Sequence, residues 1–87
     1  MLMLKADQVQ YCHVQRQVKG RVETVPGVAY YNKLFVKSAS FGKGEREKAI
    51  QQCRQDFAKQ NGLILFLVVE EETGFTLWYE DKQLQLA

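Results

Sequence analysis

The stretch LILFLVVEEE, from Leu63 to Glu72, decides how the rest of the chain is interpreted. Seven consecutive apolar residues are followed by three carboxylates, with Gly62 before the run and Gly74 after it. A short apolar run between glycines is typical of a strand buried on both faces, and it is too short to cross a bilayer as a helix. We therefore predict a central strand over about residues 63–72.

Downstream of this strand, the sequence predicts a hairpin. Thr73 and Gly74 stand where a tight reversal is needed. The segment FTLWYED alternates in polarity, which predicts a partner strand over about residues 75–81. Leu84 and Leu86 alternate again, which is compatible with a short edge strand at the tail.

Upstream of the central strand, the apolar period changes to that of a helix over about residues 45–60. One helical stripe consists of Ala49, Ile50, Cys53 and Phe57, and the opposite face is polar. Acidic residues in the first turn favour the positive end of the helix dipole, and Asn61-Gly62 offers a left-handed cap. The Ser- and Gly-containing residues 38–44 predict a loop that leads into this helix.

Two strands with period-two alternation are predicted before the helix, over about residues 9–25 and 28–37. Pro26-Gly27 is the clearest turn signal, because proline presets φ at the second turn position and glycine accepts positive φ at the third. Gly20 predicts a bulge or bend inside the first strand. The first eight residues fit a short edge strand or a frayed terminus.

These elements predict one α+β domain over residues 1–87. Its antiparallel sheet has four to five strands in the order β-β-α-β-β, with one helix packed on one face. A single helix leaves the second face uncovered, although the central strand is apolar on both sides, with Phe66 and Val68 on one and Leu65 and Leu67 on the other. Sheet curl, returning termini or another protein could bury that face, and we expect another protein to do so.

Composition and charge point to an ordinary globular domain with an uneven charge distribution. The 87 residues are 46% hydrophobic and 25% charged, with a net charge of +2. Residues 1–59 carry eleven Lys and Arg against five Asp and Glu, whereas residues 60–87 carry one against five. This split suggests an electrostatic partner. With two cysteines, no signal peptide and no membrane span, we expect a cytoplasmic protein.

The sequence shows no catalytic or metal-binding signature. Cys12 and His13 are neighbours on a strand and point to opposite faces, and Cys53 lies on the apolar helix stripe. The three acids of residues 70–72 are interpreted as a solvated strand end. Residues 42–44, GKG, lack the spacing of a phosphate loop. We expect no enzymatic activity, cofactor or metal, and a small enzyme is the third of three alternatives.

A basic and aromatic sheet face is the favoured candidate for binding a partner. We assign to it Arg21, Tyr31, Lys33, Phe35, Lys37, Phe66 and Trp78. The leading hypothesis is an accessory or regulatory protein that docks a larger or acidic protein partner, or a second copy of itself. The alternative is RNA or single-stranded nucleic acid, because aromatic residues among cations can stack bases. Against it stand the low net charge and the absence of an aromatic RNA-binding motif.

In overall size, the chain resembles small soluble accessory proteins of cyanobacterial photosynthetic and respiratory complexes. The resemblance is carried by GKGEREKAIQQCRQDFAKQNG (residues 42–62) followed by LILFLVVEEETGFTLWYED (residues 63–81). Some of those proteins assist ferredoxin docking or complex assembly. The resemblance transfers no functional residue, but it implies that the basic patch would meet an acidic electron carrier or a larger complex.

Overall fold

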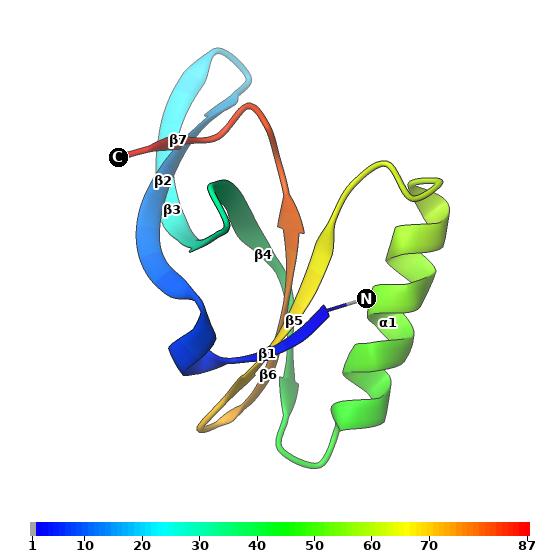
Figure 1. The fold of residues 1–87 in the computed structure, drawn as a ribbon. Coiled ribbons are helices and arrows are strands. Elements are labelled where there is room, and N and C mark those ends of the chain that lie inside the picture. Colours follow the sequence, from blue (N-terminus) through cyan, green and yellow to red (C-terminus); the bar gives the residue numbers. More distant parts are fainter. Residues whose placement is uncertain (1) are drawn as a thin grey trace.

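The computed structural model describes residues 2–87 as one helix packed on a mixed sheet of seven strands (Figure 1). The elements in chain order are β1 (Leu2–Lys5), the 3-10 turn η1 (Ala6–Gln8), β2 (Gln10–Val18), β3 (Arg21–Tyr30), β4 (Lys33–Gly42), α1 (Arg46–Lys59), β5 (Phe66–Glu71), β6 (Gly74–Glu80) and β7 (Gln85–Leu86). In space the strands follow the order β1-β5-β6-β4-β3-β2-β7. The α+β class is confirmed, but the sheet is larger than predicted and the β-β-α-β-β order is wrong.

The N-terminal half contains two hairpins where one was predicted. The expected strand over residues 9–25 is itself folded back, since β2 and β3 join at Lys19-Gly20, and β3 and β4 join at Tyr31-Asn32. All four turn residues have positive φ, between 49° and 79°. Two-residue turns of this kind match the twist of the strands that they connect. The turn predicted at Pro26-Gly27 is wrong, because both residues lie inside β3.

The pairing pattern explains how β3 tolerates Pro26. Counted from the two-residue turn, Val18 and Arg21 form a hydrogen-bonded pair, which makes His13 and Pro26 a non-hydrogen-bonded pair. The proline nitrogen therefore points away from β2. Pairing between β3 and β4 begins only at Gly27, so no strand on that side loses a hydrogen bond.

The elements after the second hairpin lie close to their predicted places. The helix and the hairpin of β5 and β6 are confirmed. The loop predicted over residues 38–44 is instead mostly the end of β4, which pairs with β6 up to Gly42 and is bulged between Lys37 and Ala39. The central strand is shorter than predicted because Leu63 to Leu65 precede β5, and Leu63 is 79% exposed.

The two ends of the described chain supply the two edges of the sheet. β1 lies parallel to β5, with Leu2 opposite Leu67, and β7 lies antiparallel to β2, with Gln85 opposite Gln15. Edge strands at both ends were considered from the sequence, and both are present. The parallel pair departs from the purely antiparallel sheet that was predicted. Of the N-terminal segment, Met1 lies outside the described residues.

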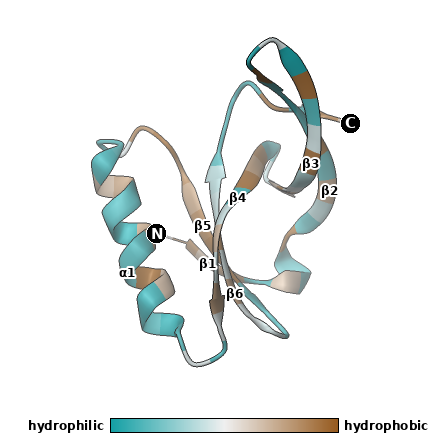
Figure 2. Ribbon diagram, turned by 180° about the vertical axis from the view of Figure 1, so that it is seen from behind, coloured by the Kyte–Doolittle hydropathy of each residue, from teal (hydrophilic) through white to brown (hydrophobic). Residues whose placement is uncertain are grey.

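The helix covers one end of one sheet face. Ala49 and Cys53 of α1 pack on Phe66, Val68 and further buried residues of β5 and β6. The outward side of α1 is hydrophilic in Figure 2, as expected for a helix that is half in water. The same face continues toward β2, and there the C-terminal segment covers it, with Leu84 lying against Val14 and Val36.

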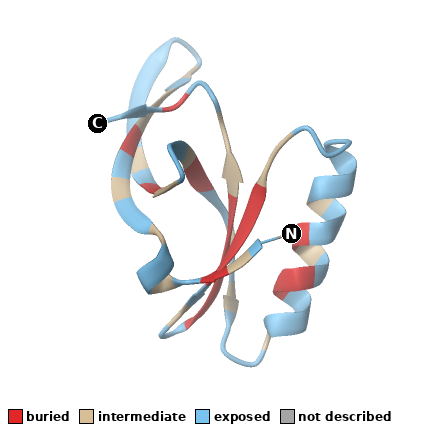
Figure 3. Cartoon of the chain, viewed as in Figure 1, coloured by how far each residue is buried: buried red, intermediate tan, exposed pale blue. Residues whose placement is uncertain are grey.

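The opposite face is buried by the curl of the sheet. Leu67 and Val69 of β5 form a cluster with residues brought over from β1, β3, β4 and β6, namely Leu4, Val28, Phe35 and Trp78. β1 and η1 run across this cluster before the chain enters β2, and buried positions follow the inner strands in Figure 3. The expectation that another protein buries one face of the central strand is therefore wrong, because sheet curl, β1 and η1 do so within one chain.

Candidate partner-binding surface

The structure does not gather the seven assigned partner-binding residues on one face. Phe35, Phe66 and Trp78 are 0%, 6% and 2% exposed, so all three belong to the core. Phe66 lies beneath α1, whereas Phe35 and Trp78 lie in the cluster on the opposite face. The large apolar side chains that were to anchor a partner instead stabilise the monomer, at about 1.5–3 kcal/mol for each fully buried side chain.

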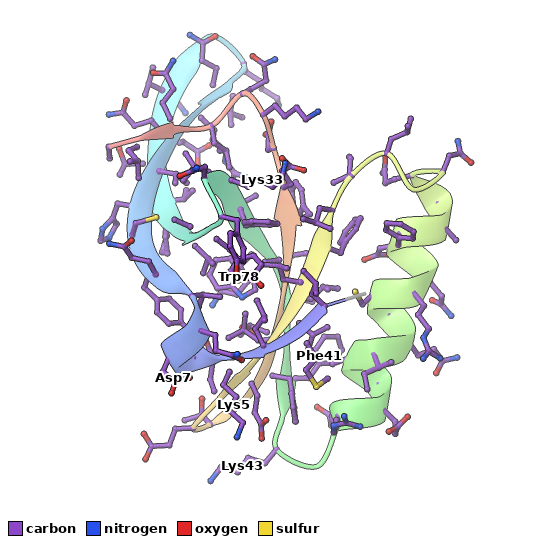
Figure 4. The ribbon with its side chains drawn as sticks, in the orientation of Figure 1. Lys5, Asp7, Lys33, Phe41, Lys43 and Trp78 are labelled. Carbon is purple, nitrogen blue, oxygen red and sulfur yellow. The ribbon has the colours of Figure 1, made fainter. Side chains whose placement is uncertain are left out.

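The one polar side-chain atom of Trp78 has a hydrogen-bond partner inside the fold. Its indole Nε1 donates a hydrogen bond to Thr76 Oγ1 at 2.7 Å. The ring of Tyr11 packs edge-on with its centroid 6.3 Å away, and Lys37 Nζ lies 5.9 Å from the centre of the indole. Figure 4 shows Trp78 pointing into the space enclosed by the curled sheet. Lys37 is exposed, but it borders the core tryptophan.

The remaining three residues lie at opposite ends of β3. Arg21 follows the first hairpin turn, whereas Tyr31, 80% exposed, lies in the second, with Lys33 just after it. Ten residues of strand separate the two turns by roughly 30 Å. Lys33 is also engaged, since its Nζ lies 3.4 Å from Glu80 Oε2. Arg21 therefore cannot share a small contact surface with Tyr31 and Lys33.

The end of the β2–β3 hairpin forms an exposed surface that was not predicted from the sequence. We call residues 15–26 the β2–β3 tip; it extends past the rest of the sheet, on the side away from α1 (Figure 1). Arg16, Lys19 and Arg21 lie on it with one acid, Glu23. Val22, between Arg21 and Glu23 in the sequence, is 61% exposed. Recognising Lys19-Gly20 as the turn, instead of Pro26-Gly27, would have identified this projection from the sequence.

The outer edge of β3 carries no strand along the tip. β4 pairs with Gly27 to Tyr30 only, so residues 21–26 pair with β2 alone in the part of the chain that the structure describes. The alternation that turns the Pro26 nitrogen outward also directs the N–H and C=O groups of Val22 and Thr24 outward. Unpaired groups of this kind are a template for another strand.

A polar cleft of about 470 Å³ lies beside the other edge of the tip, between β2 and the segment that leads to β7. It is lined by Gln15, Arg16, Gln17, Val22, Asp81, Gln83 and Gln85. Arg16 Nη2 stands 3.8 Å from Glu23 Oε1, and Arg16 Nε is enclosed without a hydrogen-bond partner. The cleft is amide-rich and carries one cation and one acid, which suits polar contacts with a protein chain.

Burial affects the titration of two thiols and one phenol. Burial raises the pKa of both thiols, Cys12 and Cys53, which keeps them protonated and weakly nucleophilic. Burial also raises the pKa of Tyr11, and its hydrogen bond to Glu71 at 2.5 Å adds to the shift.

Within residues 2–87, no three His, Cys, Asp or Glu side chains are grouped so that they could hold a metal ion. In the same range, no helix has the length and apolar character that a membrane span needs.

Comparison of the chain with protein-family models, curated proteins and solved structures gave no match in any of the three. The accessory-protein resemblance noted from the sequence gains no support from them. The interpretation of the β2–β3 tip therefore depends on its geometry and charge.

Proposed function

We propose that this chain is a non-catalytic protein-binding domain that docks an acidic surface of a larger partner through the β2–β3 tip. The observation that carries the proposal is the combination of three cations and one acid on a projecting two-stranded ribbon whose outer backbone edge is unpaired. A basic projection attracts an acidic partner during diffusional encounter and helps to orient it. The accessory role follows from this, because the domain contributes a binding surface and no chemistry of its own.

The proposed partner is still an acidic protein, as expected from the sequence, but the residues proposed to contact it are different. Arg21 remains, joined by Arg16, Lys19 and Val22, while the buried Phe35, Phe66 and Trp78 leave the set. An acidic electron carrier or a larger electron-transfer complex, as the sequence resemblance implies, is one partner with suitable charge. The nucleic-acid alternative is less favoured, because its stacking residues Tyr31 and Phe35 do not form a shared exposed platform.

Charge reversal tests the proposal. The double variant Lys19→Glu/Arg21→Glu reverses the charge of the tip, and Arg54→Glu on the exposed side of α1 serves as a control for charge reversal elsewhere on the surface. Immobilised wild-type protein and both variants are incubated with lysate from the source cells, and bound proteins are quantified by mass spectrometry. We expect acidic proteins that are retained by the wild type and by Arg54→Glu but lost with the tip variant. Equal retention by all three proteins, or no retained protein, contradicts the proposal.

A further inference from the structure

We infer that the outer edge of β3, residues 21–26, accepts an extended acidic segment of the partner as an additional strand. This inference rests on the proposed function and specifies how the partner is bound. Addition of a strand to an open sheet edge is an established mode of peptide recognition, in which backbone hydrogen bonds supply affinity and alternate side chains supply specificity.

The backbone of the tip defines which groups can bind. Glu23 and Val25 stand in hydrogen-bonded pairs with Arg16 and Val14 of β2, so their backbone groups are already used. Val22 and Thr24 alternate with them and offer both N–H and C=O outward. Pro26 offers only its carbonyl. The edge therefore presents two donors and three acceptors, enough for a short added strand.

Pro26 also limits what can be added. It cannot donate a hydrogen bond, and just beyond it β4 takes over the pairing at Gly27. An incoming strand therefore has to end at this point, which fixes its register against β3. At the other end the strand reaches Lys19 and Arg21 at the turn, where acidic side chains find opposite charges.

Charge and exposure argue for an acidic segment with alternating apolar residues. Val22 is 61% exposed and lies on the face of the edge where a neighbouring apolar side chain can cover it. The one acid of the tip, Glu23, is opposite Arg16 in the ladder and 3.8 Å from its guanidinium. This ion pair offsets the repulsion between Glu23 and acidic side chains of the added strand. A second copy of the chain would bring the same cations against this edge, so self-pairing is disfavoured.

The direct test uses a short fluorescent peptide of alternating Glu and Val, with anisotropy as the readout. Three peptides serve as controls: one of alternating Lys and Val, and two Glu/Val peptides, each with N-methyl groups on the amides of a different edge. We expect the Glu/Val peptide to bind and the Lys/Val peptide not to bind. N-methylation of one edge should abolish binding and that of the other edge should be tolerated, since only one edge faces β3.

Variants of Thr24 separate backbone recognition from charge. Thr24→Pro removes the outward N–H without removing a hydrogen bond to β2, as Pro26 already does two residues on, whereas Thr24→Val keeps the N–H and the side-chain size. We expect Thr24→Pro to weaken peptide binding about tenfold and Thr24→Val to change it less than about twofold. Circular dichroism and the melting temperature verify that both variants are folded. If Thr24→Pro does not fold, the amide-exchange measurement on wild-type protein decides.

Amide hydrogen exchange on the wild type gives an independent readout. Bound peptide should slow exchange at Val22 and Thr24, and should leave exchange at Glu23 and Val25 unchanged because their amides are already hydrogen-bonded to β2.

The inference is overturned if the peptide binds but its affinity is unchanged by Thr24→Pro and the exchange at Val22 and Thr24 is not slowed. It is also overturned if sedimentation shows that the chain pairs with itself at this edge. Peptide binding that is lost with Lys19→Glu/Arg21→Glu but insensitive to Thr24→Pro overturns this inference alone and leaves the proposed function standing. Absence of any binding to the Glu/Val peptide overturns the strand-addition inference, whereas the function proposal is decided separately by the retention experiment.

Discussion

At the scale of single residues, Gly74 has less room for a Cβ atom than the other glycines. Its φ is +152°, and a Cβ at this position would lie 2.1 Å from the carbonyl oxygen of Phe41. The close approach arises because Gly42 and Gly74 face each other at the end of the β4–β6 ladder. Only glycine permits both the torsion and the separation.

We therefore predict that Gly74→Ala lowers the free energy of unfolding by at least about 2 kcal/mol, from strain and displacement of β4. Gly44→Ala is the matched control, because no atom lies within 4 Å of its Cβ position. We expect that change to stay within about 0.5 kcal/mol. Urea unfolding of the three proteins measures the difference. Similar midpoints for Gly74→Ala and wild type would show that β4 can move away without cost.

Tyr11 provides a prediction about pH. Its hydroxyl donates to Glu71, and burial together with this carboxylate raises the pKa of the phenol. A raised pKa in the folded state means that the contribution to stability is complete below the ordinary value of about 10 and is lost as the pH rises above it. Because Tyr11 is 48% exposed, the bond is expected near the lower end of the usual range, at about 0.5–1 kcal/mol.

Tyr11→Phe should therefore lower the unfolding free energy by that amount at neutral pH, and the gap from wild type should shrink above about pH 10. Tyr31→Phe is the control, since Tyr31 is 80% exposed. Urea unfolding at a series of pH values measures both. A gap that widens with rising pH would contradict the assignment of Tyr11 as the donor.

At the scale of elements, the C-terminal segment covers part of the core, although its strand β7 is only two residues long. Leu84 is 7% exposed and covers Val14 and Val36, whereas Leu86, two residues later, is 63% exposed. We predict that Leu84→Ala lowers the unfolding free energy by about 2–4 kcal/mol, and that Leu86→Ala changes it by less than about 0.5 kcal/mol. Thermal or urea unfolding measures both. Equal effects would mean that the segment does not act as a cover.

The elements also show which parts of the fold the sequence could predict. The helix and the β5–β6 hairpin were found because their apolar periods are long and lie between clear end signals, such as Asn61-Gly62. The first half was misread because Pro26-Gly27 has the chemistry of a turn, and its place in β3 is tolerated because the pairing of β3 with β4 extends only to Gly27. That is tertiary information. The Lys19-Gly20 and Tyr31-Asn32 turns lack the usual Asn-Gly pattern, so their local signals were weaker.

The candidate site was less predictable than the fold. Alternation placed Phe35 and Lys37 on one side of a strand correctly, but it could not show that this side faces inward, because that depends on how far the sheet curls. Trp78 was uncertain for the same reason, and Phe66 was uncertain because alternation does not show which side of the strand α1 covers. The charge imbalance of residues 1–59 did indicate an excess of cations, but that three of the eleven project on the β2–β3 tip followed only when the hairpin became visible.

At the scale of the whole molecule, the three clusters of buried residues each have a cover from the same chain. Val68, Leu67 and Val69 of the central strand are all 0% exposed, so this strand leaves no apolar face for a second subunit to cover. We predict a monomer at micromolar concentration in sedimentation velocity, with or without added salt. A stable dimer would contradict the prediction, and disruption of that dimer by Thr24→Pro would assign it to the edge of β3.

The parallel pairing of β1 with β5 has a consequence for how the protein is made. Leu2 leaves the ribosome early, whereas its neighbour in the sheet, Leu67, is added only after both hairpins and α1 have been synthesised. The meander from β2 to β4 can form during this time, but β1 has no neighbouring strand to pair with until β5 has been synthesised. We expect β1 to dock late, and a nascent chain stalled before β5 to leave Leu4 open to chaperones and proteases.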